Sequence, residues 1–272
     1  MPGASVPWPL LRIEGDSRRR AFDVVAAEEP LEIRVNGRPM AVTMRTPGHD
    51  FELAAGFLLT EGVVDRADQL RSMRYCVSGP VDPQQQFNVV DVAVAGDAPA
   101  AEVAPRAFFT SSSCGLCGRT SISSVRSRAP LDVAGDPLRL SVEVLACLPD
   151  RLREAQEGFA RTGGLHAAGL FGGGGRLVCV REDVGRHNAF DKVIGWAAMR
   201  GHLPLRSTVM MASGRASFEL VQKALIAGAP ALAAVSAPSS LAVELAQEAG
   251  MTLVGFLRGH TMNVYAGGHR IA

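Results

Sequence analysis

The chain has 272 residues, of which 47% are hydrophobic and 20% are charged. This composition excludes intrinsic disorder, collagen and coiled coil, and the length allows one large domain or two small ones. The 28 basic and 27 acidic side chains leave a formal charge of +1. No global electrostatic field therefore draws the molecule to nucleic acid or to an anionic membrane, and any anion must be bound locally.

The five cysteines are odd in number and sparse for this length, which argues against a disulfide framework. We therefore expect a reducing, cytoplasmic setting. The first 20 residues contain no apolar run of signal-peptide length, and we predict that residues 1–20 form a loose arm. The uncharged stretch 224–243 contains two prolines and three serines, so we expect a helix end, a strand and a loop there and no membrane span.

Residues 21–105 are predicted to form a small α+β subdomain. Apolar and polar residues alternate on both sides of Asn36-Gly37, which is typical of a β-hairpin with a tight turn. Spacing of apolar residues then favours a helix that ends at Gly62. The predicted elements are a hairpin over 31–45, a helix over 51–59 and a strand over 87–94. A run of Gly, Ala and Pro places a boundary near residue 105.

Residues 106–272 are predicted to form an α/β domain in which strands and helices alternate. Three short apolar runs are typical of strands that are buried on both faces of a sheet. The predicted strands lie at 209–212, 231–235 and 252–256, with a hairpin around 172–175, helices over about 141–160 and further helices that begin near Asn188, Ser217 and Ser240.

The pair Cys114 and Cys117 forms a C-x-x-C motif among Ser, Gly and Thr, followed by Arg119. A basic neighbour and free backbone N–H groups favour the reactive thiolate. Such a pair fits half a zinc site, a thioredoxin-like redox site, a persulfide carrier or a structural pair. Cys147 and Cys179 stand among apolar residues and are predicted to lie in the core, so no second pair completes a zinc site.

Three predicted strand-to-helix turns carry small or hydroxyl residues. If their strands are parallel, the turns meet at one edge of the sheet, where open α/β sheets bind ligands and helix N-termini bind phosphates. No P-loop motif is present, so an NTPase is not supported. The turns lie within 181–192, before a helix that begins near Asn188, and at 212–217 and 236–240. The side chains predicted to face a phosphorylated or nucleotide ligand there are Arg186, His187, Ser213 and Arg215.

Two further segments contain histidines that could contact a ligand. Arg258 and His260 follow the last predicted strand and are expected to emerge beside it. His166 could begin the H-x-E motif of zinc deaminases, but position 168 is alanine and no P-C-x-x-C follows. His166 is therefore predicted to face a ligand or a helix end, and we expect no structural metal.

These motifs together resemble the formate dehydrogenase accessory sulfurtransferases, the FdhD family. The resemblance covers roughly residues 22–270. Its motifs occur in the family's order: Cys114-Gly-Leu-Cys117-Gly, Thr162-Gly-Gly-Leu-His166, the twelve residues Arg181-Glu-Asp-Val-Gly-Arg-His-Asn-Ala-Phe-Asp-Lys192, Ser213-Gly-Arg-Ala-Ser217 and Phe256-Leu-Arg258-Gly.

The resemblance implies an α/β, cytidine deaminase-like three-layer sandwich with a smaller β-rich N-terminal subdomain, and a homodimer. It implies that a cysteine desulfurase passes sulfane sulfur to Cys114, with Cys117 as its partner. The sulfur then goes to a molybdenum or tungsten bis(molybdopterin guanine dinucleotide) cofactor, which enters formate dehydrogenase. By the same resemblance, the cofactor-binding segment comprises Phe256, Leu257, Arg258, Gly259, His260 and Thr261.

The resulting hypothesis is a cytoplasmic sulfurtransferase with Cys114 as sulfur acceptor, which binds neither nucleic acid nor membrane. Two alternatives remain open. A thiol-disulfide oxidoreductase would form a stable Cys114–Cys117 disulfide and bind no guanine nucleotide. A cofactor chaperone would bind the nucleotide and activate the client without either cysteine. The sequence leaves the role of Cys117 open.

Overall fold

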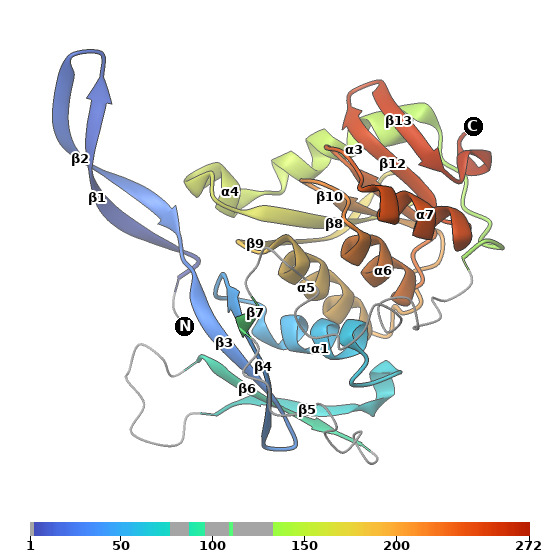
Figure 1. The fold of residues 1–272 in the computed structure, drawn as a ribbon, viewed down its shortest axis with the longest axis horizontal. Coiled ribbons are helices and arrows are strands. Elements are labelled where there is room, and N and C mark those ends of the chain that lie inside the picture. Colours follow the sequence, from blue (N-terminus) through green and yellow to red (C-terminus); the bar gives the residue numbers. More distant parts are fainter. Residues whose placement is uncertain (1–2, 77–86, 96–108, 111–132) are drawn as a thin grey trace.

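The computed structural model describes residues 3–76, 87–95, 109–110 and 133–272 (Figure 1). Cys114 and Cys117 lie outside these residues. The chain forms two main sheets, with helices packed between them and on the far side of the larger one. The predicted α/β class is confirmed, while the likeness to cytidine deaminases stays a prediction.

The N-terminal subdomain is a five-stranded sheet in the order β5-β6-β3-β4-β7. The predicted hairpin is confirmed, with Asn36 (φ 49°) and Gly37 (φ 78°) in the left-handed conformation that its two-residue turn requires. The strands are β3 (Glu29–Val35), β4 (Arg38–Arg45), β5 (Leu70–Tyr75), β6 (Val89–Val94) and β7 (Phe109–Thr110), and a 3-10 turn, η1 (Ala67–Gln69), precedes β5.

The boundary predicted near residue 105 is too early. Strand β7 comes after it but pairs in parallel with β4, so the first sheet takes a strand from beyond the boundary. The composition change near residue 100 marks a connection and not the end of the subdomain, because strand pairing over long separations leaves no local signal in the sequence.

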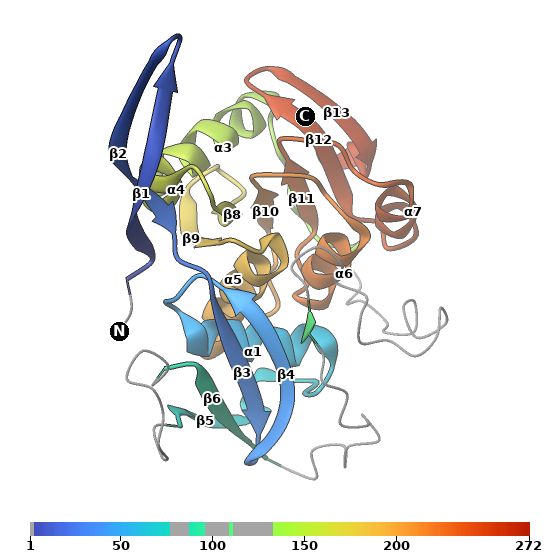
Figure 2. The same cartoon turned by 60° about the vertical axis from the view of Figure 1, so that its left-hand side comes forward.

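Helix α1 (Asp50–Glu61) covers the first sheet and then packs against α5 (Arg186–Met199) of the second subdomain (Figure 2). It ends at Gly62 as predicted, with Gly62 at φ 82°. Gly56 and Gly195 allow the two helices to approach closely. A Cβ at Gly195 would lie 1.8 Å from the backbone oxygen of Glu52, and one at Gly56 would lie 1.9 Å from that of Asp191.

The second subdomain is a six-stranded sheet in the order β13-β12-β11-β10-β8-β9. Neighbours β10, β11 and β12 are parallel, which is the condition on which the predicted ligand-binding edge depended. β8 is antiparallel to both β9 and β10, and β13 is antiparallel to β12. The strands are β8 (His166–Gly172), β9 (Leu177–Asp183), β10 (Thr208–Ala212), β11 (Ala231–Ala234), β12 (Thr252–Arg258) and β13 (Thr261–Ala266).

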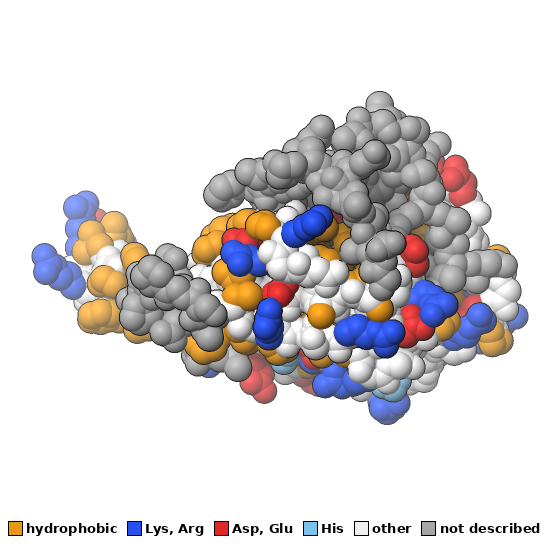
Figure 3. Space-filling view, turned by 90° about the horizontal axis from the view of Figure 1, so that it is seen from below, with side chains coloured by type: hydrophobic (Ala, Val, Ile, Leu, Met, Phe, Trp, Pro, Cys, Tyr) orange, Lys and Arg blue, Asp and Glu red, His pale blue; other side chains and the backbone are white. Residues whose placement is uncertain are grey.

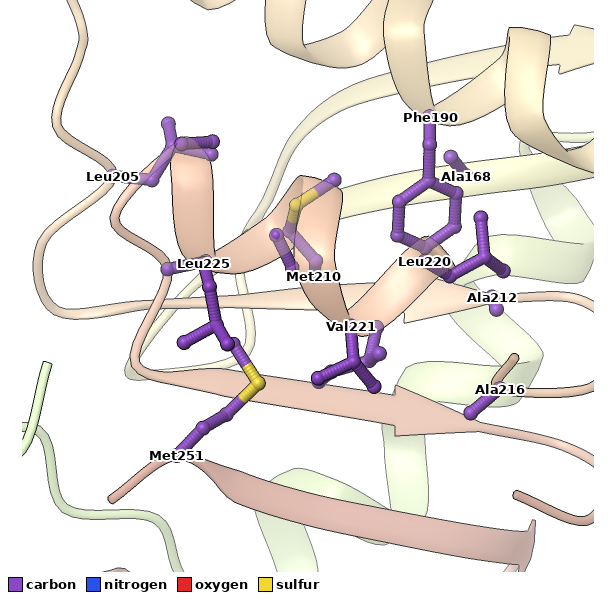
Figure 4. Close-up of a cluster of buried hydrophobic side chains, with 14 of the residues drawn as sticks. Ala168, Phe190, Leu205, Met210, Ala212, Ala216, Leu220, Val221, Leu225 and Met251 are labelled. Carbon is purple, nitrogen blue, oxygen red and sulfur yellow. The ribbon is translucent and has the colours of Figure 1, made fainter. Parts of the chain in front are cut away.

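Helices cover both faces of this sheet, which gives three layers. Helix α3 lies on one face, and α5 and α6 lie on the other (Figure 1). Figure 4 shows Phe190 of α5 and Leu220 of α6 close to Met210 of β10, in the core between these helices and the sheet. The helices besides α5 are α3 (Val142–Glu154), α4 (Glu157–Thr162), α6 (Phe218–Ile226) and α7 (Ser240–Glu248), and a last 3-10 turn is η3 (Gly268–Arg270).

Helix α3 corrects one prediction about the cysteines. Its buried face carries Leu145, Leu148 and Leu152, and Cys147 lies on the opposite, exposed face. Cys179 on β9 is buried as predicted, and burial raises the pKa of its thiol to about 11. Within the described ranges, no helix has the length and apolar character needed to cross a membrane.

The N-terminal arm is regular and not loose. β1 (Ser5–Glu14) and β2 (Ser17–Ala26) pair along their whole length without a bulge, from Ser5 opposite Ala26 to Glu14 opposite Ser17. This ribbon projects from the body of the molecule (Figures 1 and 2). It contacts the body near its base, where α4 packs against β2.

Candidate functional site

The candidate site is the edge of the six-stranded sheet at which four strands end. β9 and β10 are both antiparallel to β8, and β10, β11 and β12 are parallel, so all four end at the same edge. The first residue of β8, His166, lies there too, opposite Asp183 at the end of β9. The three predicted turns therefore meet at one edge, as the sequence pattern required.

Backbone and hydroxyl groups hold these turns together. The backbone N–H of Ala167 donates to Ser213 Oγ (2.8 Å), and the N–H of Ser213 donates to the carbonyl of Ala167 (3.0 Å). On the other side, the N–H of Ser236 donates to the carbonyl of Gly214 (3.3 Å). The turn after β10 is thus fixed from both neighbouring strands.

The turn between β12 and β13 forms the far end of this edge. The N–H of Phe256 donates to the carbonyl of Ser236 at 3.2 Å, which joins this turn to the one after β11. Phe256 is in the left-handed conformation (φ 52°), at an irregularity in the pairing of β12 with β13, and its side chain is exposed. This backbone geometry turns an aromatic side chain out of a buried strand, where it can contact a ligand.

His187 and Glu219 face each other between two helix N-termini. His187 lies in the first turn of α5, Glu219 lies in the first turn of α6, and His187 Nε2 is 3.8 Å from Glu219 Oε2. The His187 side chain, helped by backbone N–H groups, lowers the pKa of Glu219 to about 2. Glu219 is therefore a carboxylate at every physiological pH, and its negative charge lies beside the His187 side chain.

Several cationic groups surround His166. Burial lowers the pKa of His166, and the positive charges of Arg186, His187 and Arg215 lower it further. A Cβ at Gly214 would lie 3.4 Å from His166 Nδ1, so the turn after β10 passes directly beside the ring. His166 is thus a neutral imidazole in a cationic environment, which suits binding of an anion.

Three buried polar atoms at this edge have no hydrogen-bond partner among the described residues: Arg186 Nε, His187 Nε2 and Ser217 Oγ. Ser217 is the N-cap residue of α6, yet its side chain makes no capping hydrogen bond. Buried polar groups are normally hydrogen-bonded, and those left over call for an explanation. Two nitrogen donors and a hydroxyl at the positive end of a helix suit the oxygen atoms of a phosphate.

The family is decided by a match over nearly the whole chain. The family model described as FdhD/NarQ family matches residues 26–272. The chain belongs to the FdhD/NarQ family. The resemblance on which the sequence motifs were interpreted is thus confirmed.

Relatives of this FdhD/NarQ chain carry a name that refers to sulfur. A protein of Streptomyces avermitilis named sulfur carrier protein FdhD is 58% identical over 265 residues, which cover 97% of this chain and 94% of that protein. The protein of the same name from Mycobacterium tuberculosis is 56% identical over 253 residues, 92% of each chain. A crystal structure from Desulfotalea psychrophila, of a protein described as a formate dehydrogenase accessory protein, matches with a TM-score of 0.77. It is 26% identical and covers 99% of this chain and 100% of that one.

The structure brings most of the predicted cofactor-binding residues to this edge. Arg186 and His187 begin α5, Ser213 and Arg215 follow β10, and Ser213 Oγ is partly engaged as the acceptor for Ala167. In the β12–β13 turn, the exposed residues are Phe256, Arg258, Gly259, His260 and Thr261. Leu257 is the exception, because its side chain is fully buried in the core beside α3 and can offer a ligand only its backbone.

Within the described ranges, no three His, Cys, Asp or Glu side chains lie close enough together to bind a metal ion.

Glu219 is a site residue that the sequence analysis did not predict. Its only signal was its position in the first turn of α6, and nothing in the sequence connects it with His187, which is 32 residues away and on another helix.

The twelve-residue motif 181–192 serves the fold more than the site. Arg181 forms an ion pair with Glu52 of α1, with Nη2 2.9 Å from Oε1. Lys192 is fully buried, lies 2.7 Å from Asp183 and donates to the carbonyl of Thr46 (2.9 Å). These contacts join the second subdomain to the first.

Asn188 and Asp191 continue this junction. Asn188 donates to the carbonyl of Met44 at 2.7 Å, and Asp191 accepts from Thr60 Oγ1 at 2.8 Å. Within the motif, therefore, Arg186 and His187 face the candidate site, while most of the other polar side chains hold the two subdomains together.

Proposed function

We propose that the chain is a cytoplasmic sulfurtransferase that acts as a homodimer. It accepts sulfane sulfur from a cysteine desulfurase as a persulfide on Cys114 and passes it to the molybdenum bis(molybdopterin guanine dinucleotide) cofactor, which formate dehydrogenase requires. Membership of the FdhD/NarQ family and the names of the relatives support the sulfur-carrier role and the formate dehydrogenase client. The cofactor is the substrate in this proposal, and no resident metal is needed.

One observation carries the cofactor half of the proposal. Arg186 Nε, His187 Nε2 and Ser217 Oγ are buried near the edge where the strands end and make no hydrogen bond to the described residues, although His187 Nε2 lies 3.8 Å from Glu219 Oε2. A bis-pterin guanine dinucleotide presents two pyrophosphate groups, and buried arginine and helix N-termini are suited to such groups. The exposed side chains of the β12–β13 turn, Phe256 and Arg258 among them, are available for its guanine or pterin rings.

The sulfur-accepting step balances without an external oxidant. The Cys114 thiolate attacks the terminal sulfur of the desulfurase persulfide. One S–S bond forms as the other breaks, and the desulfurase cysteine leaves as a thiolate that takes up the proton lost by Cys114. Sulfane sulfur thus moves from one cysteine to another at the same oxidation level.

Intact-protein mass spectrometry after incubation with a cysteine desulfurase and cysteine tests this step. The parent and Cys117→Ala should gain about 32 Da, the mass of one sulfur atom, and Cys114→Ala should not. A gain that survives in Cys114→Ala would overturn the assignment of the acceptor. A loss of about 2 Da in the parent, which marks a disulfide, would favour the oxidoreductase alternative.

Nucleotide binding tests the other half. Calorimetry should show that GDP binds and that guanosine, which lacks phosphate, binds at least about tenfold more weakly, since each lost charge-assisted hydrogen bond costs about 1.5–3 kcal/mol. His187→Gln and Arg258→Ala should both weaken GDP binding. Equal affinity in the parent and both variants would mean that the nucleotide site lies elsewhere. Client activation that survives in Cys114→Ala would favour the chaperone alternative.

A further inference from the structure

The arm formed by β1 and β2, residues 5–26, exposes more large apolar side chains than the rest of the described molecule. Phe22 is 76% exposed and Trp8 is 59% exposed. Ten large hydrophobic residues are exposed in the part of the chain that the structure describes, and seven of them belong to the arm: Val6, Trp8, Leu11, Ile13, Phe22, Val24 and Val25. Exposed apolar surface of this extent marks an interaction site, and a two-stranded ribbon is only marginally stable in isolation.

Both faces of the arm are apolar. Trp8 pairs with Asp23, and the next pair is Pro9 with Phe22, so Trp8 and Phe22 point to opposite faces because side chains alternate along a strand. The Trp8 face also carries Val6 and Val25, and the Phe22 face also carries Leu11, Ile13 and Val24. A ribbon that packed only against its own subdomains would need one apolar face. This ribbon has two, so protein surface can cover it on both faces.

Charge is separated along the arm. Its tip carries Arg12 and the triplet Arg18, Arg19 and Arg20 against two acidic residues, Glu14 and Asp16. Near its base lie two exposed carboxylates, that of Asp23 on the arm and that of Glu28 just beyond it. Figure 3 shows basic side chains at the far end of the arm and apolar ones behind them. Two arms related by a two-fold axis would place each basic tip toward the acidic base of the other, a self-complementary arrangement.

The exposed area also favours a second copy. Two aromatic and five aliphatic side chains, at the exposures above, present on the order of 600 Å² of apolar surface per arm. If the contacted surface of the partner is included, one arm would bury about 1,200 Å² in total, which is the lower end for a stable interface. Two exchanged arms would bury about 2,400 Å², which is typical of permanent homodimers. A ten-residue strand spans roughly 33 Å, enough to reach a neighbouring molecule.

We infer that the arm is the element through which two copies of this chain associate, each arm covered on both faces by the partner molecule. The proline pair Pro7 and Pro9 limits further pairing at the outer edge of β1, and the N–H of Val24 on β2 is already bound by the side chain of Asp23 (2.8 Å). Uncontrolled strand addition is thereby restricted, which leaves side-chain packing as the basis of the contact. This inference rests on the homodimer in the proposed function but not on its sulfur chemistry.

Sedimentation velocity of the full chain tests the inference. The parent should sediment at twice the chain mass of 28.7 kDa. The double variant Trp8→Ser/Phe22→Ser should raise the dissociation constant at least about 100-fold. Met199→Ser, which alters a 49% exposed residue on α5, is the matched control and should leave it unchanged. A monomeric parent, or a double variant that dimerises as tightly as the parent, would overturn the inference.

A spectroscopic measurement keeps the test decisive if the double variant does not fold. The chain has two tryptophans, Trp8 and Trp196, so Trp196→Phe leaves Trp8 as the only indole. Its emission should shift to shorter wavelength with increasing protein concentration, in step with the dimer fraction, and shift back in high salt as the tip and base charges are screened. Dimerisation without any shift would mean that the arm is outside the interface. Because neither experiment involves persulfide, the sulfur chemistry and this interface can fail independently.

Discussion

The buried ion pair between Lys223 and Asp191 makes the contact between the subdomains open to a quantitative test. Lys223 Nζ lies 2.9 Å from both carboxylate oxygens of Asp191 and 2.7 Å from Thr60 Oγ1. The three residues come from α6, α5 and α1, and all are buried. We expect Lys223→Met, which keeps most of the aliphatic volume, to leave the Asp191 carboxylate buried without its cation.

Removal of one partner of a buried pair costs about 3–5 kcal/mol, because the remaining charge keeps its desolvation cost. For a chain of this length, each kcal/mol lowers the melting temperature by about 2–4 °C, so a decrease of about 6–20 °C is expected. Urea unfolding followed by circular dichroism, combined with differential scanning calorimetry, measures both quantities.

The matched control is the exposed pair Arg66–Asp68, where Asp68→Asn should leave the unfolding free energy unchanged within the error of the measurement. Removal of both partners in Lys223→Met/Asp191→Leu should restore part of the loss, since the buried Asp191 carboxylate is gone and the second acidic partner of Lys223, Glu61, is partly exposed to solvent. If Lys223→Met alone costs no more than the exposed control, the pair does not stabilise the junction as we argue.

Three further predictions concern packing, pH and thiol reactivity. Gly195→Ala should destabilise by about 1–3 kcal/mol in urea unfolding, because its Cβ would collide with the backbone of α1, whereas Gly174→Ala, with open space around it, should not. Glu219 has a folded-state pKa of about 2 against an ordinary 4.5, so its stabilisation is present above pH 4.5 and lost as the pH falls toward 2. Between pH 7 and pH 4, the parent should therefore lose roughly 1 kcal/mol more than Glu219→Gln; equal losses would contradict this. In native protein, iodoacetamide should alkylate exposed Cys147 at least about tenfold faster than buried Cys179, as peptide mass spectrometry can show, and equal rates would refute the exposures.

The sequence predicted those elements whose causes are local. Asn36-Gly37 specified its hairpin because few other residues accept the left-handed conformation at both positions. The apolar runs of β10, β11 and β12 predicted strands buried on both faces, and their parallel pairing followed from the helices between them. That pairing places Arg215, which follows β10, at the edge where β11 and β12 also end.

Other features depend on tertiary contacts and could not be predicted in this way. Cys147 was predicted to be buried because its sequence neighbours are apolar. Those neighbours lie on the opposite face of an amphipathic helix, since the 3.6-residue period places Cys147 on the exposed face. The arm was predicted to be loose, whereas its two strands pair along their whole length, a pairing that depends on contacts between the strands. The His187–Glu219 contact joins two helices and has no local sequence signal at all.

The longest motif of the chain, residues 181–192, mainly stabilises the contact between the two subdomains. Lys192 and Asn188 donate hydrogen bonds to backbone carbonyls of the first subdomain. These side chains are therefore satisfied only when the two subdomains are packed together. A substitution there that abolishes sulfur transfer is consequently weak evidence for a chemical role. Loss-of-function substitutions are expected to be frequent at these positions because they destabilise the fold. Folding of each variant must therefore be measured before its residue is assigned a role in sulfur transfer.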